Sequence, residues 1–241
     1  MSQSDPIVHD LEIMRAAKNY GRWIFNQFRS HLGLRIIECG AGIGNFTELL
    51  LDRELVVAVD AYAPCLERLR QRFASAPQVV PVLMDIASPE FTALAVHRPD
   101  TVVCINVLEH VEDDLRALAQ MRTVLPPAGR LALLVPAFPC LYGTIDRKIG
   151  HYRRYTKREL VAKLRRAGFR IRALFYMNVV APLGWWLNNR LLQRQEESPA
   201  QVLVFDRWIV PWLQPLEAAV RPPFGLSVIA IAETGMPSSH G

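Results

Sequence analysis

Cysteine is scarce in this sequence. The 241 residues contain four cysteines, Cys39, Cys65, Cys104 and Cys140, and none of them shows the C-x-x-C spacing of zinc or iron–sulfur sites. We therefore expect no metal site. Scattered cysteines also indicate a reducing, cytoplasmic setting.

The sequence also lacks an export signal, a membrane-spanning run and a flexible linker. Its first fifteen residues carry three acids and no apolar stretch, unlike a signal peptide. The charge-free run at 173–189 contains Asn178, Pro182 and Gly184 and falls short of a spanning helix. With 51% hydrophobic and 21% charged residues, the chain has enough apolar material for a core. We expect one soluble domain over residues 1–241.

Positive charge is concentrated in one segment. Residues 147–172 contain eleven lysines and arginines and one acid, although the net charge of the chain is only +5. Such a block could attract nucleic acid, anionic lipid or an acidic substrate, or it could form a solvated helix face. The sequence leaves these alternatives open.

Short apolar segments alternate with amphipathic segments along the first 135 residues. The pattern predicts strands at 35–39, 55–59, 79–84, 101–105 and 129–135, and helices at 11–31, 45–52, 63–75 and 113–124. Beyond them it predicts a helix at 156–167 and strands at 170–176 and 226–232. Strands that alternate with helices favour a parallel α/β sheet.

Three glycines follow the first predicted strand. Gly40, Gly42 and Gly44 allow a tight turn and a close approach of the backbone to a ligand. A dinucleotide-binding turn reads GxGxxG, but here the third glycine comes one residue early. The acid Glu38 precedes the turn, where it disfavours a pyrophosphate and favours a positively charged amino group.

Acids also end the next two predicted strands. The carboxylate of Asp60 can accept both hydroxyls of a ribose, since it offers two oxygens. Asp85 can accept from an adenine amino group while its apolar neighbours pack against the ring.

These segments together resemble class I S-adenosylmethionine-dependent methyltransferases. The similar motifs are ECGAGIGNFTELL, AVDAY, MDI, INVLEHVEDD and PPAGRLALLVPA, and the resemblance covers residues 20–232. It implies an α/β, Rossmann-like, mostly parallel seven-stranded sheet of order 3-2-1-4-5-7-6, with the last strand antiparallel and helices on both faces. It also implies that S-adenosylmethionine is the cofactor.

The resemblance assigns cofactor-binding roles to particular residues. Glu38 would meet the methionine amino group, and Asn106 would offer it a backbone carbonyl. The remaining implied positions are Gly40, Gly42 and Gly44 beside the methionine and ribose, Asp60 and Ala61 at the ribose and adenine, and Met84, Asp85 and Ile86 around the adenine.

Two histidines are candidate catalytic bases. His110 follows Asn106 by four residues at the mouth of the expected pocket, and histidine titrates in the useful range. A structural histidine is the alternative. His151 is the second candidate. Glu109 and Asp113 are expected to serve in helix capping and solvation.

The segment 136–155 is expected to form the acceptor-site loop. Tyr142, Tyr152 and Arg154 are its candidate substrate-binding residues, because this mix suits a carboxylate, phosphate or phenolate. The alternative is an architectural loop ordered by an ion pair between Asp146 and an arginine.

Apolar and aromatic residues fill the segment 177–223. We interpret it as a helical insertion that covers the acceptor pocket, with peripheral membrane contact as the alternative. Residues 1–33 are expected to form an N-terminal helical cap.

The leading functional hypothesis is methyl transfer to an oxygen or nitrogen of a small-molecule acceptor, apolar or anionic. Methylation of a lipid-linked or membrane-associated acceptor is one alternative, and a non-catalytic S-adenosylmethionine-binding protein is another. The NPPY-type tetrad of adenine methylation is replaced by Asn106-Val107-Leu108-Glu109, and no RNA-binding module is evident, so a nucleic-acid acceptor is not expected. The early third glycine and Glu38 disfavour an NAD-dependent oxidoreductase. Oligomeric state is left open.

Overall fold

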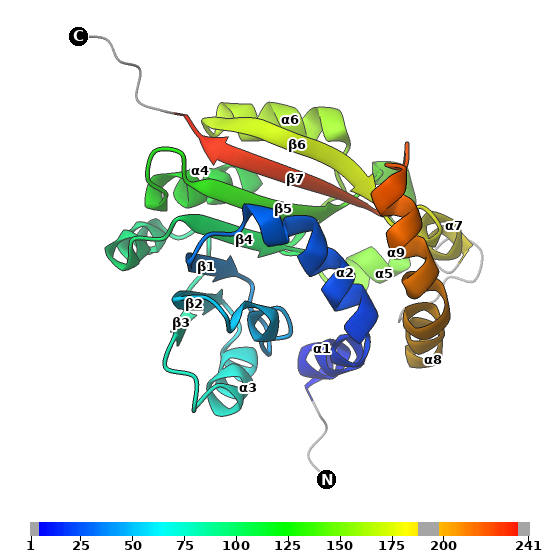
Figure 1. Ribbon diagram of the computed structural model, residues 1–241, viewed down its shortest axis with the longest axis horizontal. Helices are drawn as coiled ribbons and strands as arrows, with labels where there is room; N and C mark the ends of the chain where they lie inside the picture. Colours follow the sequence, from blue (N-terminus) through cyan, green and yellow to red (C-terminus); the bar gives the residue numbers. More distant parts are fainter. Residues whose placement is uncertain (1–4, 188–197, 236–241) are drawn as a thin grey trace.

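The strands of the chain join one sheet. The computed structural model describes residues 5–187 and 198–235, and the sheet they form has the order β3-β2-β1-β4-β5-β7-β6 (Figure 1). Its strands are β1 (Arg35–Cys39), β2 (Leu55–Asp60), β3 (Val79–Leu83), β4 (Thr101–Ile105), β5 (Arg130–Pro136), β6 (Phe169–Met177) and β7 (Ser227–Thr234). Strands β1 to β5 pair in parallel, and β7 is antiparallel to β5 and β6. The predicted order and the antiparallel last strand are confirmed.

Helices cover both faces of this sheet. The described α-helices are α1 (Pro6–Ala16), α2 (Lys18–Phe28), α3 (Ala63–Arg72), α4 (Asp114–Val124), α5 (Thr144–Lys148), α6 (Lys157–Arg166), α7 (Ala181–Trp186), α8 (Pro199–Val204) and α9 (Val210–Ala219). Shorter 3₁₀ segments are η1 (Arg29–His31), η2 (Thr47–Leu50), η3 (Pro89–His97), η4 (Leu108–His110) and η5 (Pro139–Leu141), and η7 (Phe205–Ile209) is a π-helix. One core joins α4, α6 and η3 to the sheet, and a second joins α2 and α9 to the opposite face. Because the central strands are buried on both faces, they are apolar throughout.

The N-terminal segment forms two helices, so the prediction of one helix over 11–31 is wrong. The break lies at Ala17, which has non-helical backbone angles. An acid far away in the chain caps the second helix: the Asp206 carboxylate accepts a hydrogen bond from the backbone N–H of Tyr20 at 2.7 Å. Since the first N–H groups of a helix have no intrahelical partner, this contact satisfies one of them.

The helix predicted at 45–52 is also wrong, because only the 3₁₀ segment η2 forms there. The backbone takes positive φ at Gly40, Gly42 and Gly44, so the glycine turn occupies the residues before η2. In contrast, the helix predicted at 156–167 is confirmed. Thr156 accepts from the backbone N–H of Glu159 at 3.2 Å, and the Glu159 carboxylate accepts from that of Thr156 at 2.9 Å.

Part of the basic block at 147–172 is used in ion pairs within the fold. Lys163 of α6 pairs with Asp114 of α4 at 2.6 Å. On β6, Arg170 and Arg172 both pair with Glu233 of the neighbouring β7. These pairs connect adjacent elements, which favours an architectural role for the block.

The predicted insertion at 177–223 forms α7, α8, η7 and α9, and residues 188–197 of it lie outside the described residues. Figure 1 shows α8 and α9 together at the end of the sheet where β6 stops and β7 starts. Glu217 of α9 accepts from the backbone N–H groups of Asn178 at 3.0 Å and Val179 at 2.8 Å, and so ties α9 to the start of α7. Among the described helices, none combines the length and apolar character needed to cross a bilayer.

Candidate active site

A cavity of about 1130 Å³ lies at the carboxyl ends of β1, β2 and β4. Open α/β sheets bind ligands at this edge. Most of the predicted cofactor residues line it, namely Gly40, Gly42, Asp60, Ala61, Met84, Asp85, Ile86 and Asn106. The N-terminal segment contributes Ile7, Leu11 and Met14 to the same lining. Glu38 and Gly44 do not line the cavity.

The glycine turn keeps one wall of the cavity bare. Gly40 has φ +69°, and a Cβ there would lie 2.1 Å from Cγ2 of Val107 in the segment after β4. Gly44, with φ +85°, is equally confined, since its Cβ would lie 2.3 Å from the Phe73 ring beside α3. Both glycines are required by close packing, and of the two only Gly40 lines the cavity.

Asp60 is held rigidly at the rim of the cavity. Its Oδ2 accepts from the backbone N–H of Gly42 at 2.7 Å, and its Oδ1 accepts from that of Tyr62 at 2.8 Å. Burial raises the pKa of Asp60, although both hydrogen bonds oppose this shift. Each carboxylate oxygen has a further lone pair, so this carboxylate can also accept two ribose hydroxyls.

Glu38 lies beneath the glycine turn. It is 3% exposed, and its Oε2 accepts from the hydroxyl of Thr47 at 2.6 Å. Burial raises the pKa of Glu38 to about 8, against the effect of the Thr47 hydrogen bond. The side chain is therefore mostly protonated at neutral pH when no cation is beside it.

This burial predicts a pH dependence of stability. Because the folded pKa lies above the unfolded value, the folded state binds the extra proton, and Glu38 lowers the free energy of unfolding as pH rises from about 5 to 8. The loss is on the order of 4 kcal/mol. The test is denaturant unfolding of the unaltered protein and of Glu38→Gln at pH 5 and pH 8. In Glu38→Gln the free energy of unfolding should no longer show this part of the decrease between the two pH values. Parallel curves for the two proteins would contradict the assignment.

The second end of the cavity carries the predicted acceptor residues. His110, His151, Tyr152 and Arg154 line it. Tyr142 does not. Its hydroxyl instead donates to the backbone carbonyl of His151 at 2.7 Å, so it supports the loop behind the cavity wall.

Asp146 organises this end from below the surface. It is fully buried, and its Oδ1 accepts from Nε of Arg154 and lies 2.8 Å from Nδ1 of His151. Its Oδ2 accepts from the backbone N–H of Gly143 at 2.9 Å. Burial opposes ionisation, but the His151 contact and the Arg154 charge outweigh it, so the pKa of Asp146 is lowered. The predicted ion pair between Asp146 and an arginine is confirmed.

Glu109 is the site residue that sequence reasoning missed. Its predicted capping and solvation role is wrong, whereas Asp113 does cap α4 by accepting from the backbone N–H of Arg116 at 3.0 Å. Glu109 is 0% exposed and lines the cavity, and burial raises its pKa to about 8. Neither carboxylate oxygen has a hydrogen-bond partner among the described residues. The sequence did offer a signal for Glu109. Its position next to His110, shortly after the buried parallel strand β4, is one where site residues are expected.

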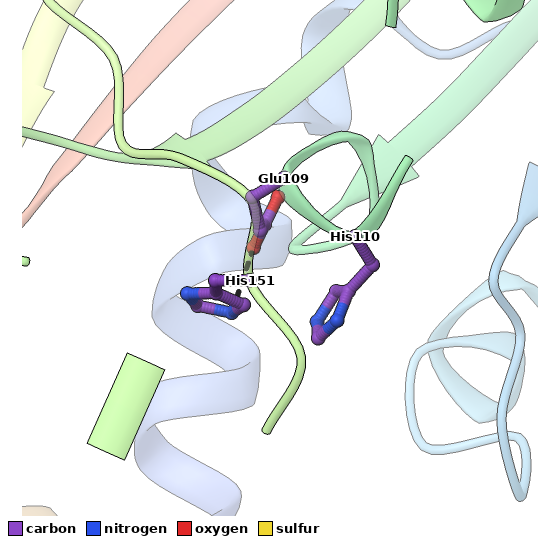
Figure 2. A group of neighbouring side chains, drawn as sticks. All are labelled: Glu109, His110 and His151. Carbon is purple, nitrogen blue, oxygen red and sulfur yellow. Dashed lines mark ion pairs between the residues drawn. The ribbon is translucent and has the colours of Figure 1, made fainter. Parts of the chain in front are cut away.

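Glu109, His110 and His151 converge in the cavity wall (Figure 2). The rings of His110 and His151 meet edge to face with 4.5 Å between centroids. Close packing and the neighbouring His151 lower the pKa of His110 to about 4. His110 is therefore neutral at pH 7 and only a weak base, but it keeps a lone pair that it can share.

Residues 13–174 match the model of the methyltransferase domain family. The chain belongs to this family. Two uncharacterized methyltransferases of Mycobacterium tuberculosis H37Rv are 34% identical to the chain over 107 and 120 residues, which are 44% and 49% of its length. The matched parts are 52% and 44% of those proteins, so the chain spans about half the length of these curated relatives.

Solved structures share the fold of this methyltransferase. An S-adenosylmethionine dependent methyltransferase from Mesorhizobium loti aligns with a TM-score of 0.59 at 19% identity, covering 89% of this chain and 99% of that one. The [4+2]-cyclase SpnF aligns with a TM-score of 0.61 at 16% identity, covering 91% and 82%. Family and sheet order together identify a class I methyltransferase whose cofactor is S-adenosylmethionine.

The residues of this methyltransferase fit that cofactor. The cavity has Gly40 and Gly42, which carry no side chain, on one wall and an oriented carboxylate at Asp60. Ala61, Met84 and Ile86 give it an apolar slot beyond Asp60. Asn106 takes φ +52°, a left-handed conformation that asparagine tolerates better than most residues.

Proposed function

We propose that the protein transfers the methyl group of S-adenosylmethionine to an oxygen or nitrogen of a small-molecule acceptor. The supporting observation is that one cavity of about 1130 Å³ joins the cofactor residues to the histidine and arginine end. Ligand pockets commonly measure roughly 300–1,000 Å³, so this volume has room for a nucleoside cofactor and a small acceptor together.

Different residues of the cavity bind the cofactor and the acceptor. Asp60 and the glycine turn bind and orient the cofactor, while Tyr152 and Arg154 contribute contacts for an anionic acceptor. S-adenosylmethionine supplies a methyl group already activated on a sulfonium. Protein groups then need to align the acceptor and exclude water. Neutral His110 lines the acceptor end of the cavity, where it contributes a hydrogen-bonding contact to the acceptor.

An untargeted labelling screen tests this proposal. The protein is incubated with small-molecule extracts and S-adenosylmethionine that carries a deuterated methyl group, and products are identified by mass spectrometry. We expect at least one labelled acceptor. Because SpnF shares this fold and is described as a [4+2]-cyclase, the fold alone does not fix the reaction. Binding of S-adenosylhomocysteine without any labelled product would favour the non-catalytic alternative.

A membrane-associated acceptor is the second candidate, favoured by an apolar stripe that runs from the end of α8 through η7 to the residue after α9. Val204, Trp208, Trp212, Leu216 and Val220 recur every fourth residue, and each is 55% to 79% exposed. Residues four apart share one helix face, so these side chains form a continuous strip. Tryptophan and leucine on one helix face are typical of helices that lie at a membrane surface.

The charges beside the stripe match an anionic bilayer. In the segment 198–225 both acids, Asp206 and Glu217, are buried and used in backbone capping. Both cations, Arg207 and Arg221, are exposed. The surface of this segment is therefore apolar and cationic, and anionic headgroups attract such surfaces.

Vesicle sedimentation tests this second candidate. The protein should sediment with vesicles that contain phosphatidylglycerol and much less with pure phosphatidylcholine. Trp208→Ser combined with Trp212→Ser should reduce sedimentation by about 10-fold or more, because two large apolar groups no longer insert. Val96→Ser is the matched control, since Val96 is 77% exposed on η3, away from the stripe. Failure of the unaltered protein to sediment with anionic vesicles would reject this candidate.

A further inference from the structure

Three potential metal ligands meet at the acceptor end of the cavity. Glu109, His110 and His151 each offer one ligand atom, and these atoms all lie within 4.8 Å of one another. Glu109 and His110 come from η4, and His151 comes from the loop after α5. Figure 2 shows the Glu109 carboxylate and both rings directed toward a common space.

The His151 ring lies between the carboxyl groups of Asp146 and Glu109. The Asp146 carboxylate, paired with Arg154, can only accept a hydrogen bond, so Nδ1 of His151 carries the proton. In the neutral ring, Nε2 then presents a lone pair. Nε2 of His151 lies 3.7 Å from Oε1 of Glu109, which is too far for a hydrogen bond. Both atoms are then acceptors, so neither can donate a proton to the other.

The Glu109 carboxylate adds an independent sign of a missing cation. It is 0% exposed, and both of its oxygens lack hydrogen-bond partners among the described residues. A buried carboxylate without a partner is costly, and such groups are normally paired or coordinate a metal. An ion between Glu109 and His151 would satisfy both side chains.

We propose that Glu109, His110 and His151 bind a divalent transition-metal ion of the zinc type. Two imidazoles and one carboxylate suit zinc and its first-row neighbours, whereas magnesium and calcium prefer all-oxygen sites. Tetrahedral zinc holds its ligand atoms roughly 3.3–3.5 Å apart. The Glu109 and His151 atoms are 3.7 Å apart and all three ligand atoms lie within 4.8 Å of one another, so the three side chains must draw closer together to bind the ion. This proposal replaces the expectation of no metal, which rested on cysteine spacing alone.

Asp146 acts as the positioning residue for this ion. Metal-binding histidines commonly donate their second ring N–H to a carboxylate, which fixes the tautomer and the ring orientation. The contact of 2.8 Å between Nδ1 of His151 and Oδ1 of Asp146 has this arrangement.

With three protein ligands, the site keeps an open coordination position, as catalytic zinc sites do. This part of the inference rests on the proposed function. The open position faces the cavity and selects acceptors that carry an oxygen or nitrogen donor, such as a phenol or a carboxylic acid. The metal would hold that donor in a fixed place beside the cofactor end.

Cobalt titration tests the site directly. The full chain without an affinity tag is stripped with EDTA and titrated with Co²⁺, whose visible d–d absorption reports coordination. We expect one Co²⁺ per chain, displaced by Zn²⁺. Glu109→Gln and His110→Ala should each weaken binding by about 100-fold or more, as loss of a metal ligand requires. His97→Ala on η3, outside the cavity, should bind as the unaltered protein does.

S-adenosylhomocysteine binding is measured calorimetrically in the same variants. It should be retained in both ligand variants, which shows that they fold and separates this proposal from the proposed function. His110 is exposed, so His110→Ala is the variant least able to disturb the fold. The metal site is overturned if the unaltered protein takes up no Co²⁺, or if Glu109→Gln and His110→Ala bind it as tightly as His97→Ala.

Discussion

Asp60→Ala is expected to weaken the binding of S-adenosylmethionine by about 100-fold or more. Two hydrogen bonds from ribose hydroxyls to a carboxylate would be lost, and each such bond contributes about 1.5–3 kcal/mol. A loss of about 3 kcal/mol corresponds to roughly 100-fold in the dissociation constant. Calorimetric titration with S-adenosylhomocysteine measures this effect without turnover.

Asp60→Ala also removes the hydrogen-bond acceptor of two backbone N–H groups, those of Gly42 and Tyr62, which donate to the Asp60 carboxylate. Asp60→Asn separates the two effects, because an amide keeps the shape of the side chain but offers one accepting oxygen. We expect Asp60→Asn to bind S-adenosylhomocysteine more weakly than the unaltered protein and more tightly than Asp60→Ala. Asp52→Ala is the matched control, since that side chain is 62% exposed. Unchanged affinity in Asp60→Ala would remove Asp60 from the cofactor site.

Asp146→Ala is expected to lower the free energy of unfolding by about 3–5 kcal/mol, the usual cost of breaking a buried ion pair. The guanidinium of Arg154, 4% exposed, would lose its charged partner. The hydrogen bonds to Gly143 and His151 would be lost as well. Urea unfolding of EDTA-treated protein measures the change, so that metal binding does not contribute.

A surface pair provides the comparison. Glu54 pairs with Arg35, but its side chain is 57% exposed. Glu54→Ala should therefore cost no more than about 1 kcal/mol, because water screens and solvates exposed charges. Equal losses in Asp146→Ala and Glu54→Ala would show that the buried pair is not a main support of the acceptor loop.

Local sequence determined the sheet of this protein. Strand ends predicted from apolar runs differ from the observed ends by at most two residues, since a strand buried on both faces must be apolar along its length. The glycine turn, Asp60 and the helix at 156–167 were equally readable. In each case the residues that interact lie close together in the sequence or at the end of a recognisable strand.

Tertiary structure decided the features that depend on distant partners. The first turn of α2 is capped by Asp206, which lies 186 residues later in the chain than Tyr20. Gly44 packs against Phe73, and Tyr142 supports His151 without entering the cavity.

The clearest example is Glu109. Its sequence neighbours resemble those of an ordinary helix-capping acid, and only the fold buries it beside His151 with both oxygens unsatisfied. Residue periodicity reports which side chains are buried, because burial follows the local geometry of helix and strand. It does not report which buried groups face each other, because that depends on how the finished elements pack.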